Sequence, residues 1–86
     1  MRKLYEKLFR YGITMIVKPV HYMHTYCVEF ERGDHHFRFV ITTDFIDEER
    51  LEYMFMSYLN QFIREYGFEP IQISKEWKGV LESYDS

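Results

Sequence analysis

The sequence predicts an α+β fold: a three-stranded antiparallel sheet, with a possible short fourth strand, that carries a short N-terminal helix and a long helix packed on one face. Residues 25–42 alternate apolar and polar side chains as a β-hairpin does, and the residues after them repeat apolar side chains at helical spacing. The expected order is α-β-β-β-α-(β)-α. No internal repeat, low-complexity tract or linker divides the chain, so residues 1–86 are expected to form one domain.

The hairpin register follows from placing Gly33-Asp34 as a two-residue turn. One face then pairs Phe30 with Phe37, Val28 with Phe39, and Tyr26 with Ile41. The other face pairs Glu31 with His36, Glu29 with Arg38, Cys27 with Val40, and Thr25 with Thr42. One apolar face and one mostly polar face are typical of a half-buried antiparallel sheet.

A short helix and a strand are predicted before the hairpin. Residues 2–11 place Leu4 and Leu8 at helical spacing, and Gly12 is a suitable helix stop. The β-branched run at 13–18 predicts a strand. Pro19 ends that strand or places it at a sheet edge, because proline has no N–H to donate.

The second helix has the strongest periodicity. Its apolar side chains fall within a stripe about 100° wide and comprise Leu51, Phe55, Tyr58, Leu59, Phe62 and Tyr66. Asp44 or Asp47 is expected to cap its start, Asp47, Glu48 and Glu49 complement the helix dipole, and Gly67 ends it. Tyr53 lies opposite the stripe and Met56 lies at its edge.

Beyond this helix, residues 69–74 predict a short strand that presents Ile71 and Ile73. Ser74 is expected to cap a final helical turn that carries Trp77, Val80 and Leu81, and the tail at 82–86 is expected to fray. The predicted core comprises Tyr26, Val28, Phe30, Phe37, Phe39, Ile41, Leu51, Phe55, Leu59 and Phe62.

Charge is distributed unevenly along the chain. Residues 1–43 carry seven Lys/Arg against four Asp/Glu, whereas residues 44–86 carry four against ten. An acidic second half argues against direct nucleic-acid binding and favours a partner protein with a basic surface, although a solvated helix face is an equal alternative. A single cysteine and no apolar run of membrane-spanning length predict a cytoplasmic protein without a membrane segment.

Catalytic and metal chemistry are not expected. His24 and His35 are expected at opposite ends of the hairpin, roughly 25 Å apart, and adjacent His35 and His36 are expected to point to opposite faces. One ion therefore cannot bind all four histidines, which include His21. Cys27 has no neighbouring base. The sequence contains no P-loop, GxGxxG, GxSxG or HExxH motif. We therefore expect a protein that is not an enzyme and has no cofactor.

Two families share the predicted layout. The order α-β-β-β-α resembles that of double-stranded-RNA-binding domains, but those domains place lysines where this chain has Asp47-Glu48-Glu49. The element order, the acid-led second helix and the size resemble small acidic anti-CRISPR proteins of phages. That resemblance rests on layout and implies binding to a basic groove of an RNA-guided nuclease.

These observations predict a non-enzymatic protein-binding protein, such as a phage-type inhibitor of a host nucleic-acid enzyme, located in the host cytoplasm. Its acidic and aromatic contact surface is expected to use Glu29, Glu31, Asp34, Asp47, Glu48, Glu49, Glu52 and Tyr53, with Met56 as an apolar anchor. The alternative is a homo-oligomeric structural or assembly protein, which associates through a sheet edge or through the helix flank with Tyr53, Met56 and Ile63. A less favoured alternative is a nucleic-acid-binding domain with the topology of double-stranded-RNA-binding domains.

Overall fold

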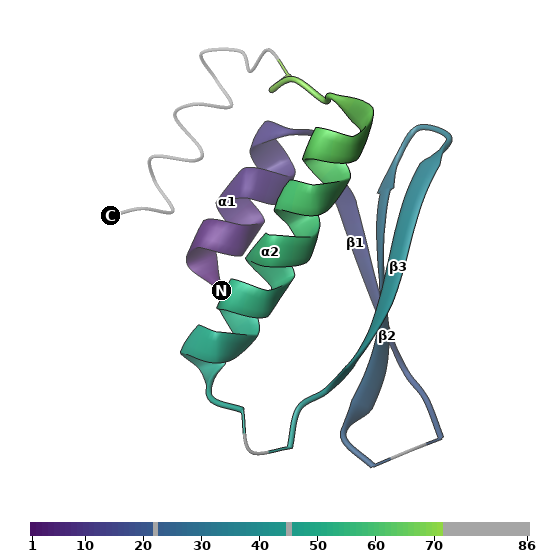
Figure 1. The fold of residues 1–86 in the computed structure, drawn as a ribbon, viewed down its shortest axis with the longest axis vertical. Helices are drawn as coiled ribbons and strands as arrows, with labels where there is room; N and C mark the ends of the chain where they lie inside the picture. The colour runs from purple at the N-terminus through teal and green to yellow at the C-terminus, as the bar shows by residue number, and fades with distance from the viewer. Residues whose placement is uncertain (22, 45, 72–86) are drawn as a thin grey trace.

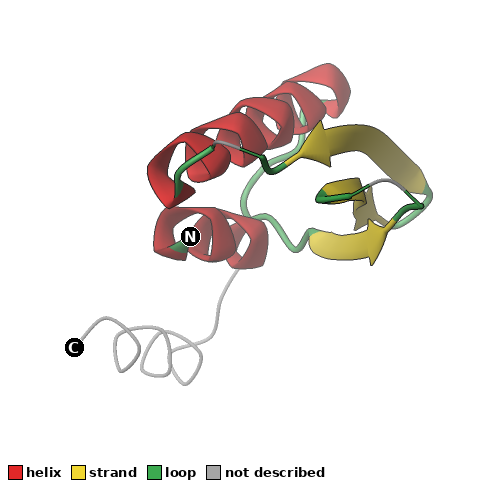
Figure 2. Ribbon diagram, turned by 90° about the horizontal axis from the view of Figure 1, so that it is seen from below, coloured by secondary structure: helices red, strands yellow, loops and turns green. Residues whose placement is uncertain are grey.

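The computed structural model describes residues 1–21, 23–44 and 46–71. Helix α1 spans Arg2–Arg10, strands β1, β2 and β3 span Thr14–Pro19, Thr25–Arg32 and His35–Thr42, and helix α2 spans Glu48–Tyr66 (Figure 1). The strands form one antiparallel sheet in the order β1-β2-β3, and both helices lie on the same side of it (Figure 2). This arrangement confirms the predicted α+β fold.

The hairpin register is confirmed at every predicted pair, from Thr25 opposite Thr42 to Glu31 opposite His36. Gly33 has a φ of 60°, whereas Asp34 does not adopt a positive φ, which is the combination of a type II′ turn. This turn matches the twist of the flanking strands and so holds the register. Strand β1 pairs with the other side of β2 and ends at Pro19, which confirms the edge position of that proline.

The core lies between the inner face of the sheet and the helices. Its aromatic side chains contact one another across the two layers: the rings of Phe30 and Phe39 have centroids 5.4 Å apart, and Tyr58 stacks on Phe39 at 4.1 Å. Seven predicted core residues are buried, namely Val28, Phe30, Phe39, Ile41, Phe55, Leu59 and Phe62. The prediction omitted three further buried residues, Leu4, Leu8 and Ile13. The first two lie in α1, and Ile13 directly precedes β1.

The other three predicted core residues are only half-buried, which corrects the sequence-based assignment. Tyr26, Phe37 and Leu51 pack against the core without being enclosed by it. Phe37 belongs to the edge strand β3, Tyr26 pairs with the terminal Pro19 of β1, and Leu51 lies in the first turn of α2. Each therefore lies near an end or an edge of the elements that enclose the core.

Both ends of α2 follow local rules. Of the two predicted caps, Asp47 is the one present, because its carboxylate accepts a hydrogen bond from the Arg50 N–H at 2.8 Å. At the other end Gly67 has a φ of 65°, and the N–H of Phe68 donates to the Ile63 carbonyl at 3.0 Å. That left-handed glycine and its hydrogen bonds form the Schellman motif that stops the helix.

The predicted fourth strand is not present over residues 69–71. The Ile71 N–H instead donates to the carbonyl of Arg10 at 2.9 Å, which satisfies an open carbonyl at the end of α1. The remainder of the predicted strand, the final helical turn and the tail lie outside the described residues. Within the described part of the chain, no helix is long and apolar enough to cross a membrane.

Candidate functional site

The predicted contact residues lie in two separate regions. Glu29 and Glu31 are on the outer face of the sheet and Asp34 is in the hairpin turn, whereas Asp47, Glu48, Glu49, Glu52, Tyr53 and Met56 belong to the start of α2. Strand β3 leads from the hairpin turn towards the start of α2, and α2 packs on the inner face of the sheet, opposite the face that carries Glu29 and Glu31 (Figure 1). The fold therefore does not join these residues into one surface.

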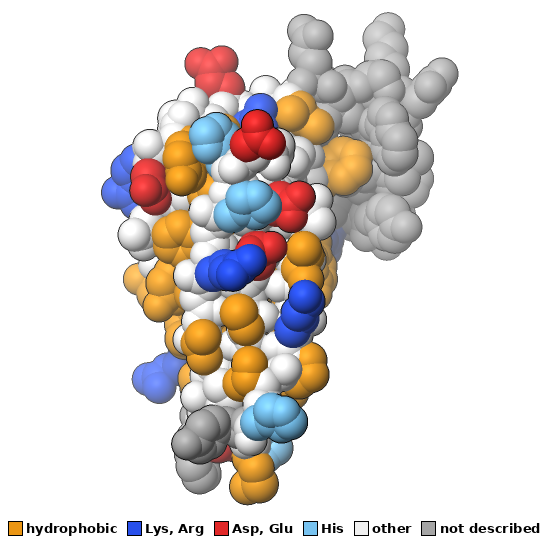
Figure 3. Space-filling view, turned by 90° about the vertical axis from the view of Figure 1, so that its right-hand side faces the viewer, with side chains coloured by type: hydrophobic (Ala, Val, Ile, Leu, Met, Phe, Trp, Pro, Cys, Tyr) orange, Lys and Arg blue, Asp and Glu red, His pale blue; other side chains and the backbone are white. Residues whose placement is uncertain are grey.

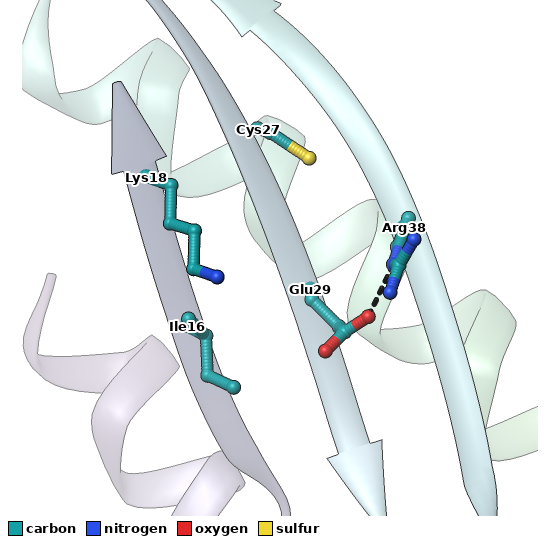
Figure 4. A pocket seen from close by; sticks show the side chains of 5 residues that line it. All are labelled: Ile16, Lys18, Cys27, Glu29 and Arg38. Carbon is teal, nitrogen blue, oxygen red and sulfur yellow. Dashed lines mark hydrogen bonds and ion pairs between the residues drawn. The ribbon is translucent and has the colours of Figure 1, made fainter. Parts of the chain in front are cut away.

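The outer face of the sheet carries charges of both signs. A shallow hollow there is lined by Ile16, Lys18, Cys27, Glu29 and Arg38 (Figure 4). The Arg38 Nε donates a hydrogen bond to Glu29 Oε2. This bond and the guanidinium charge lower the pKa of Glu29 below its ordinary value of 4.5. Because Glu29 is paired and only 16% exposed, little of its charge is available to a partner protein.

Figure 3 shows imidazole and carboxylate side chains close together on this side of the molecule. Two of these contacts involve His36: its Nδ1 lies 3.9 Å from Glu29 Oε1 and 3.9 Å from Glu31 Oε2. The other histidines with described contacts lie elsewhere, since His24 Nε2 is 3.7 Å from Asp44 and His35 packs on the Tyr66 ring at 4.2 Å. The separation of these histidines is confirmed.

The grouping of His36 with two glutamates was not predicted from the sequence, because the expected ligands were other histidines and not carboxylates. The signal was available, because the predicted register already placed Glu31 opposite His36 and Glu29 two residues along the same strand.

The carboxylates at the start of α2 divide into structural and exposed groups. Asp47 caps the helix, and Glu52 Oε2 lies 3.0 Å from the Met1 α-amino group and accepts the Leu4 N–H at 3.4 Å. The bond to the amino group is the main reason that the pKa of Glu52 is lowered. Glu48 Oε1 also lies 3.5 Å from the Met1 α-amino group, but its side chain is 79% exposed, and Glu49 is exposed as well.

Tyr53 is the large exposed side chain of this region. It is 74% exposed and lies on the side of α2 that faces away from the core. It lines an open hollow along the helix together with Met54, Ser57, Tyr58 and Gln61. The Tyr58 ring, which lines the hollow, stacks on Phe39 of the sheet. Met56, the expected apolar anchor, is half-buried and packs against the core.

No family model matches the chain, and no curated protein or solved structure shows significant similarity to it. The resemblance to anti-CRISPR proteins stays a prediction based on layout. The functional interpretation therefore rests on the side chains described above and on their charges.

Proposed function

We propose that the protein is a non-enzymatic protein-binding protein and that its contact surface is the start and exposed side of α2. This helix surface comprises Glu48, Glu49, Tyr53, Ser57 and Gln61, all exposed. The observation that carries the proposal is Tyr53, an aromatic ring that is 74% exposed next to an open hollow.

Tyrosine is suited to the centre of a protein interface because its ring buries a large area and its hydroxyl keeps a hydrogen-bonding group. Here the ring is mounted on a helix whose opposite side is held in the core by Phe55, Leu59 and Phe62. A fixed backbone lowers the entropy lost on binding, since only the tyrosine rotamer has to be ordered. The position of Tyr53 therefore favours a pre-organised contact.

The charge of the helix surface favours a partner with a basic surface. Glu48 and Glu49 are exposed beside the capping Asp47, and the neighbouring Arg50 offsets only part of this charge. Exposed carboxylates at an interface rim act mainly on the association rate and on its dependence on salt. Direct binding of nucleic acid is disfavoured at this position because the phosphates are also negative.

The finer form of the proposal is an inhibitor of a host nucleic-acid enzyme, such as an RNA-guided CRISPR nuclease, that acts in the host cytoplasm. Enzymes of this class present basic grooves, and carboxylates in such a groove occupy the places of phosphates. The acid-led α2 and the element order support this form of the proposal.

The experiment captures the partner from the source cell with the full chain and then measures its affinity for charge variants. The variant Glu48→Lys/Glu49→Lys should weaken binding and flatten its dependence on salt. The matched control is Glu65→Lys/Glu69→Lys, two exposed acids of which one is in the last turn of α2 and the other just beyond its end. Glu52 is left intact because of its structural bonds. Equal loss in both variants, or none in the first, contradicts the proposed surface.

A homo-oligomeric assembly protein is the second candidate, favoured by β1 and β3, which are the edge strands of the sheet among the described residues. Exposed Val40 on β3 and Val17 on β1 make these strands able to pair with another copy. Sedimentation at micromolar concentration separates the candidates. A monomer supports the binding of a different protein, and a stable dimer supports assembly.

A further inference from the structure

We propose that Glu29, Glu31 and His36 form a binding site for a divalent transition-metal ion, best suited to Zn²⁺, on the outer face of the sheet. The site lies away from the helix surface and is independent of the proposed protein-binding function. Its three ligand atoms, one from each side chain, all lie within 4.8 Å of one another. This proposal departs from the sequence-based expectation that the histidines take no part in a metal site.

The strand register brings the three side chains together. Glu31 and His36 are directly opposite each other on β2 and β3, and Glu29 is the next residue of β2 on the same face. Side chains on opposite positions of an antiparallel pair have Cβ atoms about 5 Å apart. The ligands are therefore positioned by the two most regular strands of the fold and not by a loop.

The distances suit a shared ion. Zn²⁺ binds nitrogen and carboxylate oxygen at about 2.0–2.2 Å, which places neighbouring ligand atoms roughly 3–4 Å apart. The His36 Nδ1 lies 3.9 Å from one oxygen of each glutamate. The side chains of His36 and Glu31 are 50% and 39% exposed, so they have room to rotate. Such rotation brings the two carboxylates to the spacing that a shared ion requires.

Arg38 supports the proposed site by a hydrogen bond to a ligand and does not bind the ion itself. It binds Glu29 Oε2, so the Oε1 atom that faces His36 is left as the metal ligand. Hydrogen bonds of this kind orient ligating carboxylates in metal sites. The guanidinium also adds a positive charge close to the ion. We therefore expect a weak site, whose remaining positions are filled by solvent.

The donor set selects among ions. One imidazole nitrogen with two carboxylate oxygens suits Zn²⁺ and its neighbours in the transition series, whereas Mg²⁺ and Ca²⁺ prefer oxygen ligands alone. Because the ion competes with a proton for the imidazole, binding should also weaken at acidic pH. Selectivity for Zn²⁺ over Mg²⁺ therefore tests whether His36 is a ligand.

The test titrates the full, untagged chain with ZnCl₂ by calorimetry and follows the histidine side chains by NMR. We expect one ion per chain and a shift of the His36 ring signals. His36→Ala and Glu31→Gln should each weaken binding about tenfold or more. The matched control is His21→Ala, an exposed histidine of the loop before β2, which should bind as the wild type does.

Three results overturn the site: no Zn²⁺ binding by the wild type at millimolar concentration, unchanged affinity in His36→Ala, or Mg²⁺ binding as tight as that of Zn²⁺. Unchanged affinity in His36→Ala places the ion elsewhere, for example at His24 and Asp44. Circular dichroism of each variant confirms that it is folded, so that lost binding reports on the ligands. None of these results bears on Tyr53.

Discussion

The two sides of α2 differ in what they contribute to the molecule. One side places Phe55, Leu59 and Phe62 in the core, where each meets the aromatic inner face of the sheet. The other side exposes Tyr53 and Ser57 next to an open hollow. The buried side is explained by the fold, whereas Tyr53 is 74% exposed and is not part of the core. Under the proposed function, stability and binding are carried by different residues of the same helix.

Substitution on the buried side should have the largest effect. The ring of Phe62 packs against Phe30, Phe37 and Phe68, with centroids 6.4, 6.0 and 5.0 Å away. Phe62→Ala removes these contacts and leaves a cavity, so the free energy of unfolding should fall by about 3–5 kcal/mol. Urea denaturation measures this change. A loss below about 1 kcal/mol shows that α2 is not fixed through this side.

The helix start should have an intermediate effect. Asp47→Ala removes the acceptor for the Arg50 N–H and should cost about 1 kcal/mol of stability. Asp47→Asn is the control, because asparagine caps a helix about as well but carries no charge. If both variants lose the same stability, the charge and not the hydrogen bond is the main contribution of Asp47.

The outer face of the sheet should contribute less and in a pH-dependent way. Arg38 lowers the pKa of Glu29 in the folded state, so their ion pair stabilises the fold above about pH 4.5. This contribution to stability is lost as the pH falls through the lowered pKa of Glu29. Arg38→Gln should therefore reduce the urea midpoint at about pH 7, and the difference from wild type should shrink as the pH falls through the lowered pKa of Glu29. A difference that persists in acid contradicts this cause.

Substitution on the exposed side should have the smallest effect on stability. Tyr53→Ala should change the free energy of unfolding by less than about 0.5 kcal/mol, because the side chain is 74% exposed. Thermal unfolding followed by circular dichroism measures this. A loss comparable to that of Phe62→Ala shows that Tyr53 has a packing role and removes the contrast between the two sides.

The parts of the fold set by local rules were predictable. A two-residue turn and strict alternation determined the hairpin register. The acidic residues that complement the helix dipole indicated where α2 begins, and Gly67 indicated where it ends. The burial of Leu4, Leu8 and Ile13 was not predictable in the same way, because it depends on α1 lying beside α2. Residues 69–71 read as a strand by composition, yet Ile71 bonds to Arg10, a tertiary partner that periodicity cannot reveal.

The candidate site was predicted in part. The exposure of Tyr53 followed from its angle on the helix, but the roles of the carboxylates depend on neighbours distant in sequence. Glu52 looks as available as Glu49 in the sequence, and only the packing of α1 against α2 brings Leu4 and Met1 to it. The division of the acidic residues between two regions likewise follows from the path of β3.

The most direct test of the central claim is the affinity of the captured partner for Tyr53→Ala, measured by biolayer interferometry next to Tyr5→Ala. Tyr5 is 56% exposed on α1 and serves as the matched control. If the exposed side of α2 is the contact surface, Tyr53→Ala binds about tenfold more weakly or worse, whereas Tyr5→Ala binds as the wild type does. Equal dissociation constants for wild type and Tyr53→Ala contradict the account.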